Sequence, residues 1–151
     1  MGGFPMKKWL AFAFSFIPFL YGILATYSIN ILPAEAAFIM GPVLAAAFLL
    51  MWNRLAKIAH FHLSNDKKTL LYMHIPGIIV FVILCINAAA QGSFIHGWFQ
   101  NLLLYYLMPV LPISLLLSQL VQNVYFVYAI TIVFMLCAAY MGCHSKRRHV
   151  K

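Results

Sequence analysis

Hydrophobic and polar positions divide the chain into long apolar segments separated by short polar ones. A helix needs about 20 mostly apolar residues to cross the roughly 30 Å hydrocarbon core of a bilayer. Four segments have this length and composition, and each predicts a transmembrane helix. They cover about residues 9–32, 34–52, 70–90 and 124–142.

A further apolar segment, residues 102–120, is interrupted by Pro109 and Pro112. Proline lacks a backbone donor and clashes with the preceding turn, so it kinks or breaks a helix. The segment therefore either crosses as a kinked fifth span or enters the membrane and returns to the same side. A re-entrant backbone has to be buried in protein or line a wet cavity, because lipid satisfies no backbone hydrogen bonds.

The positive charges favour the re-entrant path. Lysine and arginine gather at the cytoplasmic ends of membrane spans. If segment 102–120 crosses fully, the last cluster of basic residues lies outside, whereas a re-entrant segment leaves all ten basic residues inside. We expect four full spans plus a proline-broken or re-entrant segment, with five full spans as the alternative. The three basic clusters are Lys7 and Lys8; Arg54, Lys57, Lys67 and Lys68; and Lys146, Arg147, Arg148 and Lys151.

The expected organisation is one all-α transmembrane domain over residues 1–151, with its N-terminus inside. Residues 53–69 form a cytoplasmic loop, and residues 143–151 form a basic cytoplasmic tail. The first half of that loop alternates basic and apolar positions. It is expected to extend the second span as an amphipathic turn that rests on anionic headgroups, with a partner protein as the alternative occupant of this surface. The expected location is a cell membrane, most simply the bacterial cytoplasmic membrane.

Composition supports the membrane class and excludes others. The chain is 65% hydrophobic and 8% charged, whereas a soluble domain is roughly 25% charged. The net charge of +8 comes from residues beside the spans, which indicates membrane topology rather than nucleic-acid binding. The first apolar segment is longer than the core of a signal peptide, so we expect it to remain as an anchor.

Two ionisable residues are candidate membrane sites. Glu35 follows Pro33 in the first turn of the second span, where a carboxylate stabilises the positive end of the helix dipole. A cation or proton site is the alternative at Glu35, because ionisable groups in membrane segments are often functional. His74 lies near the inner end of the third span. It is interpreted as an interface histidine, with a proton relay as the alternative.

No catalytic, cofactor-binding or metal-binding set is expected from the spacing. His60 and His62 are two residues apart and point to different faces of a helix. His144 and His149 lie in a basic tail that repels cations. The cysteines form no CxxC pair and are interpreted as packing residues. They are Cys85, Cys137 and Cys143.

Small and polar residues recur at four-residue spacing in the first two spans. Such stripes let helix backbones approach closely and allow hydrogen bonds between helices. Packing within the bundle is the first interpretation, and a docking face for another membrane protein is the alternative. The predicted packing face consists of Pro18, Gly22, Thr26, Asn30, Gly41 and Ala45.

These patterns favour a non-catalytic accessory, regulatory or immunity-type subunit that acts through helix packing in the membrane. A small pore, a holin-like protein or a small-solute transporter is the alternative, and a membrane enzyme or a metal site built from the inner-loop histidines is third. The expected partners are anionic lipid headgroups and another membrane protein or a second copy of the chain. No cofactor and no nucleic acid are expected.

Overall fold

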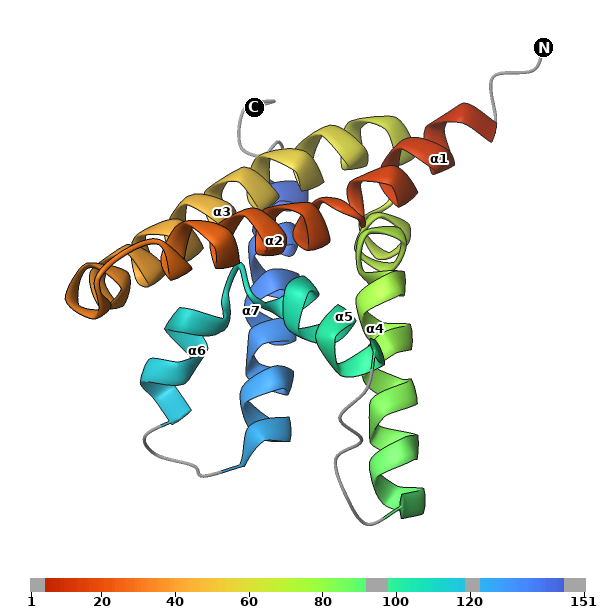
Figure 1. Cartoon of the computed structure of the whole chain (residues 1–151). Coiled ribbons are helices and arrows are strands. Elements are labelled where there is room, and N and C mark those ends of the chain that lie inside the picture. Colours follow the sequence, from red (N-terminus) through yellow and green to blue (C-terminus); the bar gives the residue numbers. More distant parts are fainter. Residues whose placement is uncertain (1–4, 92–97, 119–122, 146–151) are drawn as a thin grey trace.

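A computed structural model describes residues 5–91, 98–118 and 123–145. Every regular element in these ranges is a helix, which confirms the all-α prediction (Figure 1). The helices are α1 (Pro5–Phe14), α2 (Ile17–Asn30), α3 (Ala34–Leu63), α4 (Asp66–Gln91), α5 (Trp98–Leu107), α6 (Leu111–Ser118) and α7 (Val124–His144).

Within the described ranges, three helical stretches are long and apolar enough to cross a membrane. They are Trp9–Asn30, which joins α1 and α2, Ala34–Leu63 and Tyr125–His144. They overlap the predicted spans 9–32, 34–52 and 124–142, although the second stretch continues 11 residues past the predicted end, and the three apolar helices support a membrane protein. The predicted span 70–90 lies on α4, a helix of 26 residues.

The first of these stretches is broken after Phe14. Pro18 stands in the first turn of α2, and it has no N–H to continue the hydrogen-bond ladder of α1. The buried Ser15 hydroxyl donates to the Phe12 carbonyl at the break. A kink at this point follows directly from the proline.

The predicted loop 53–69 is almost entirely helical. α3 continues without interruption to Leu63, and only Ser64 and Asn65 separate it from α4. Ser64 adopts the left-handed conformation with φ 52° and donates its N–H to the His60 carbonyl. Asn65 Oδ1 accepts from the Lys68 N–H and caps α4. The two helices therefore meet at a sharp corner.

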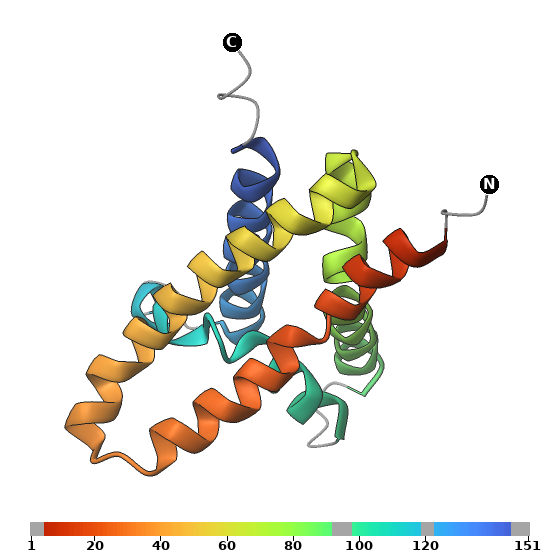
Figure 2. The same cartoon turned by 90° about the horizontal axis from the view of Figure 1, so that it is seen from above.

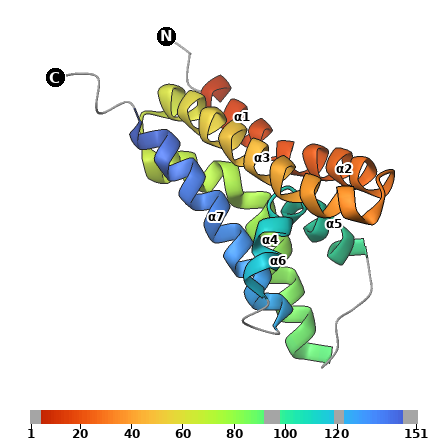
Figure 3. The same cartoon turned by 90° about the vertical axis from the view of Figure 1, so that its left-hand side faces the viewer.

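Two pairs of helices diverge from this corner. The α2–α3 hairpin runs in one direction, and the antiparallel helices α4 and α7 run in another (Figures 1 and 3). Seen from above, the α2–α3 hairpin extends well away from α4 and α7 (Figure 2). The end of α3, the start of α4 and the end of α7 lie together at the upper end of Figures 1 and 3.

Helices α5 and α6 fill the angle between the two pairs. They form a V whose turn, residues 108–110, includes the buried residues Pro109 and Val110. α5 packs on α2 and α4, and α6 packs on α7 and α3. A buried hydrogen bond of 2.7 Å joins the Thr131 and Ser114 hydroxyls and ties α6 to α7. The segment predicted to be broken is thus broken at its prolines and surrounded by the other helices.

The apolar core includes residues at and next to this turn. Phe48 and Trp52 from α3 stack at 5.6 Å between ring centroids, and both are fully buried. Tyr106 and Leu107, just before the turn of the V, lie in the same core cluster with Met135 from α7. The V is therefore part of the core rather than an appendage to it.

Candidate functional site

The densest cluster of reactive side chains lies where α3, α4 and α7 meet. His60 Nδ1 is 3.2 Å from one carboxylate oxygen of Asp66, and His144 Nδ1 is 3.7 Å from the other. The ligand atoms of His60, Asp66 and Cys143 all lie within 4.8 Å of one another. We call His60, Asp66, Cys143 and His144 the corner cluster.

Local structure positions each member of the corner cluster. His60 lies in the last turn of α3, and its carbonyl accepts from the left-handed Ser64 that ends this helix. Asp66 is the first residue of α4. Cys143 and His144 are the last two residues of α7. The cluster therefore depends on the two-residue turn and on the return of α7 to the same corner.

The members of the corner cluster differ in how far they are exposed. The Cys143 residue is 2% exposed, whereas the side chains of His60 and Asp66 are 21% and 23% exposed. The Nδ1 atoms of His60 and His144 are buried and make no hydrogen bond, although each faces the carboxylate of Asp66. The cluster is therefore partly accessible at His60 and Asp66 and closed at Cys143.

Helix dipoles add a negative field at this corner. α3 and α7 both end here, and a helix C-terminus carries roughly half a negative charge. The N-terminus of α4 brings its positive end to Asp66, which favours the ionised carboxylate. Lys67 and Lys68 follow Asp66 but are exposed. The corner can thus attract a cation despite the basic residues around it.

Comparisons of the chain with protein-family models, with curated proteins and with solved structures found no match. The chemistry of the site therefore rests on its own residues. A histidine nitrogen, a carboxylate oxygen and a thiol sulfur at these distances form a donor set that can hold a metal ion.

The first predicted membrane site, Glu35, lies far from the corner cluster. It is an exposed residue in the first turn of α3, at the opposite end of that helix from His60. The N-cap residue of α3, Pro33, forms no side-chain hydrogen bond to the helix. Glu35 is thus placed to act on the helix dipole.

The second predicted membrane site, His74, lies in the core. It is 1% exposed, and its Nδ1 is 2.9 Å from the Leu70 carbonyl oxygen, which accepts its proton. Its ring and the Trp52 ring are T-shaped, with 5.6 Å between their centroids. The contacts described for His74 are therefore a backbone carbonyl and an aromatic ring.

The predicted packing face is used inside the molecule over its inner half. A Cβ on Gly22 would lie 1.9 Å from the Tyr105 carbonyl oxygen of α5, and one on Gly41 would lie 3.2 Å from Pro112 Cβ. Pro18 and Ala45 are also buried. The outer half differs: Thr26 donates to its own helix at Gly22, and Asn30 is exposed. The buried part of the packing face therefore contacts α5 at Tyr105 and α6 at Pro112.

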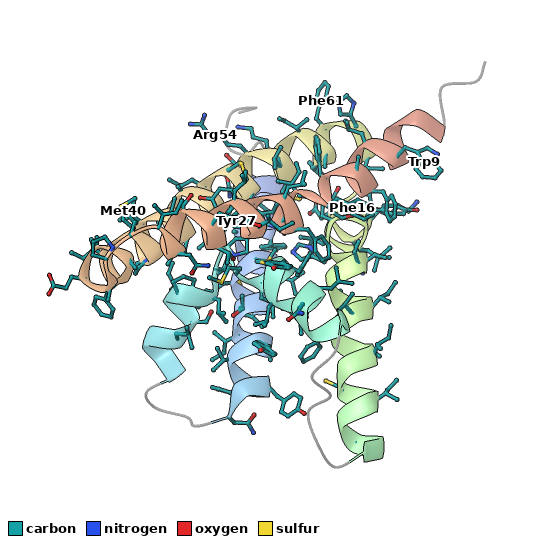
Figure 4. All side chains as sticks on the ribbon, viewed as in Figure 1. Trp9, Phe16, Tyr27, Met40, Arg54 and Phe61 are labelled. Atoms are coloured by element: carbon teal, nitrogen blue, oxygen red, sulfur yellow. The ribbon has the colours of Figure 1, made fainter. Side chains whose placement is uncertain are left out.

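Of the predicted basic interface, the described side chains lie near the corner. Arg54, Lys67 and Lys68 are exposed and Lys57 is half-buried. Figure 4 shows Arg54 and Phe61 projecting from α3 away from the other helices. Lys7 and Lys8 belong to α1, but their side chains lie outside the description. Lys146, Arg147 and Arg148 also lie outside the described residues.

The sequence suggested a metal site of the inner-loop histidines near Asp66 as a third alternative, but it did not connect that loop with Cys143 and His144. The adjacent Cys143 and His144 end the last span, and His60 and Asp66 flank a two-residue turn. These two pairs meet only if the end of α7 lies on the same side of the membrane as that turn. Because the sequence left open whether segment 102–120 crosses the membrane, it did not establish on which side α7 ends.

Proposed function

We propose that the chain is a multi-pass protein of the bacterial cytoplasmic membrane with four full spans and a re-entrant α5–α6 hairpin. The observation in support is the length and burial of that hairpin. α5 has 10 residues and α6 has 8, which is about 15 Å and 12 Å of helix, less than the roughly 30 Å of a bilayer core. Two of the three turn residues, Pro109 and Val110, are buried in protein, which agrees with the cover that a re-entrant backbone requires.

The same threading agrees with the charges. It puts the start of α1, the α3–α4 turn and the end of α7 on the cytoplasmic side. All ten lysines and arginines then lie on that side, as expected from the positive-inside rule.

Within this membrane, we propose that the protein is a non-catalytic accessory or regulatory subunit. The observation that carries this proposal is the outer part of the α2–α3 hairpin, residues 26–40, which we call the arm. None of the arm residues is buried. Among them Ile31 is 81% exposed and Phe38 is 71% exposed; Figure 4 labels Tyr27 and Met40 on the same two helices.

The arm belongs to the least covered of the candidate spans. In the α3 span, 17% of the most apolar 18-residue stretch is buried, whereas 44% of the corresponding stretch in α7 is buried. Such an apolar surface needs a cover of lipid or of a neighbouring helix. An accessory subunit would use it to pack against its partner.

Photo-crosslinking in native membranes tests the arm. A photoreactive phenylalanine analogue at Phe38 is compared with one at Val133, which is 54% exposed on α7. We expect a discrete protein adduct from position 38 and only lipid adducts from position 133. Lipid adducts alone at both positions would contradict the proposal. An adduct between two copies of the chain would replace it with a homo-oligomer.

The pore alternative finds little support among the described residues. Their buried polar side chains are few, and each lies within hydrogen-bond distance of a backbone carbonyl. The buried Tyr106 hydroxyl makes no hydrogen bond to the described residues, but Tyr106 lies within the apolar core cluster. We expect the purified protein in liposomes to produce no ion conductance, and a robust conductance would favour the pore. These buried polar residues are Ser15, Thr69, His74, Ser114 and Thr131.

A further inference from the structure

The spacing within the corner cluster is close to that of a metal coordination shell. Zinc bonds of about 2.0–2.3 Å in a tetrahedron place neighbouring ligand atoms about 3.3–3.8 Å apart. His60 Nδ1 and Asp66 Oδ1 are 3.2 Å apart. One imidazole nitrogen of His60, one carboxylate oxygen of Asp66 and Cys143 Sγ all lie within 4.8 Å of one another. Small rotations of the side chains would bring all three atoms onto one ion.

The histidine nitrogens at this corner need a positive charge between them and the carboxylate. The lone pair of a neutral Nδ1 atom repels the lone pairs of a carboxylate oxygen. A proton on Nδ1 or a metal ion between the two atoms turns this repulsion into attraction. His60 Nδ1 faces Asp66 at 3.2 Å without hydrogen-bond geometry, and a metal ion bound by both atoms would satisfy both.

The donor set selects the class of metal. Calcium and magnesium prefer shells built from oxygen alone, whereas a mixture of nitrogen, oxygen and sulfur suits zinc and related divalent ions. The Asp66 carboxylate and a Cys143 thiolate together balance a charge of +2. The thiol proton of Cys143 leaves to solvent when the ion binds. The two helix C-termini at the corner add to the attraction.

We propose that His60 Nδ1, one oxygen of Asp66 and Cys143 Sγ bind a single zinc-class divalent ion. His144 is a positioning residue: its Nδ1 lies 3.7 Å from the second oxygen of Asp66, and a small shift of the side chain would let it donate to that oxygen and orient the carboxylate. The ion joins the consecutive helices α3 and α4 to the end of α7, which is distant in the sequence. This site rests on the proposed topology, because α7 has to end on the same side of the membrane as the α3–α4 turn.

Cobalt substitution tests the donor set in the full-length protein, purified without a histidine tag. Co²⁺ alone is the probe, because a thiolate ligand produces a charge-transfer band and a tetrahedral shell intensifies the d–d bands. We expect one equivalent of Co²⁺ to produce both features in the wild type. Cys143→Ser should abolish the charge-transfer band, whereas Cys137→Ser, at an exposed position of the same helix, should keep it.

Zinc competition against bound Co²⁺ measures the other members of the site. His60→Gln and Asp66→Asn should each weaken zinc binding by at least about tenfold, and His144→Gln by about tenfold. The matched control is His62→Gln, two residues from His60 on α3, which should bind zinc like the wild type. Equal loss in His60→Gln and His62→Gln would contradict the site.

A measurement on the unmodified protein covers the case in which a variant fails to fold. Zinc should slow the reaction of Cys143 with a maleimide by at least about tenfold, while Cys137 reacts at the same rate with and without zinc. No cobalt band in the wild type, or no protection of Cys143, overturns the metal site. Cysteine labelling that puts the end of α7 opposite the α3–α4 turn overturns the topology itself, so the two failures are distinguishable.

Discussion

At the scale of single residues, two glycines determine how closely the helices approach. A Cβ on Gly22 would lie 1.9 Å from the Tyr105 carbonyl oxygen, and one on Gly142 would lie 2.2 Å from the Asn53 carbonyl oxygen. Both obstacles are backbone atoms, which cannot rotate away as a side chain can. Where α7 approaches α3 at Gly142, the Asn53 side chain of α3 donates to the Ala138 carbonyl of α7 at 2.9 Å.

We predict that Gly22→Ala destabilises the protein by about 1–3 kcal/mol, as overpacking does elsewhere. Gly41→Ala should cost less, because its nearest obstacle is the Pro112 ring at 3.2 Å. Ala46→Val, at an exposed position of α3, is the control and should be close to neutral. Thermal unfolding in one detergent measures all three. Equal effects at positions 22 and 46 would contradict the close approach of α2 and α5.

Residue patterns in the sequence predicted these small positions but not their neighbours. The four-residue spacing of Pro18, Gly22, Gly41 and Ala45 within their spans indicated a packing face, and all four are buried. Spacing along one helix carries no information about which helix approaches it. Cys143 and Asp66 illustrate the same limit, since their meeting depends on the threading of everything between them.

At the scale of elements, the prolines decide where segment 102–120 breaks. Pro109 lies in the turn and Pro112 in the first turn of α6, where its missing N–H costs no hydrogen bond. The sequence therefore predicts the break, whereas the direction that the chain takes afterwards depends on contacts with α2, α3 and α7. The length of α3 shows a similar limit, because polar residues after Trp52 resemble a loop yet continue the helix.

We predict that the hydrogen bond between Thr131 and Ser114 couples α6 to α7. Thr131→Val and Ser114→Ala should show a coupling free energy of about 0.6 kcal/mol in a double-mutant cycle, the average for membrane helices, and no more than about 1.7 kcal/mol. Thermal unfolding supplies the four stabilities. Thr26→Val is the control for the loss of a hydroxyl, because Thr26 bonds only to its own helix in the described structure. Additive effects would mean that the two helices are not coupled at this point.

At the scale of the whole molecule, the corner cluster lies at the point from which the two pairs of helices diverge. His60, Asp66 and Cys143 come from three helices, and the proposed ion links them. A ligand that binds the folded state alone stabilises it in proportion to the logarithm of its concentration. Metal binding and global stability should therefore change together.

We predict that zinc raises the thermal unfolding midpoint of the wild type and that a chelator reverses the gain. At a free zinc concentration of 100 times Kd the stabilisation should be about 2.7 kcal/mol. Cys137→Ser should retain the full effect, whereas Cys143→Ser should lose most of it. An equal zinc response in both variants would show that the stabilising ion binds elsewhere.

The central claim is that α5 and α6 enter the membrane and return, so that the α3–α4 turn and the end of α7 share one side. Single cysteines at three exposed positions, Ser64, Asn123 and Ser145, in a background free of native cysteines, test it with an impermeant maleimide. Asn123→Cys should react in intact cells, and Ser64→Cys and Ser145→Cys only after permeabilisation. Reaction of Ser145→Cys in intact cells, with Asn123→Cys protected, would establish five spans and contradict the claim.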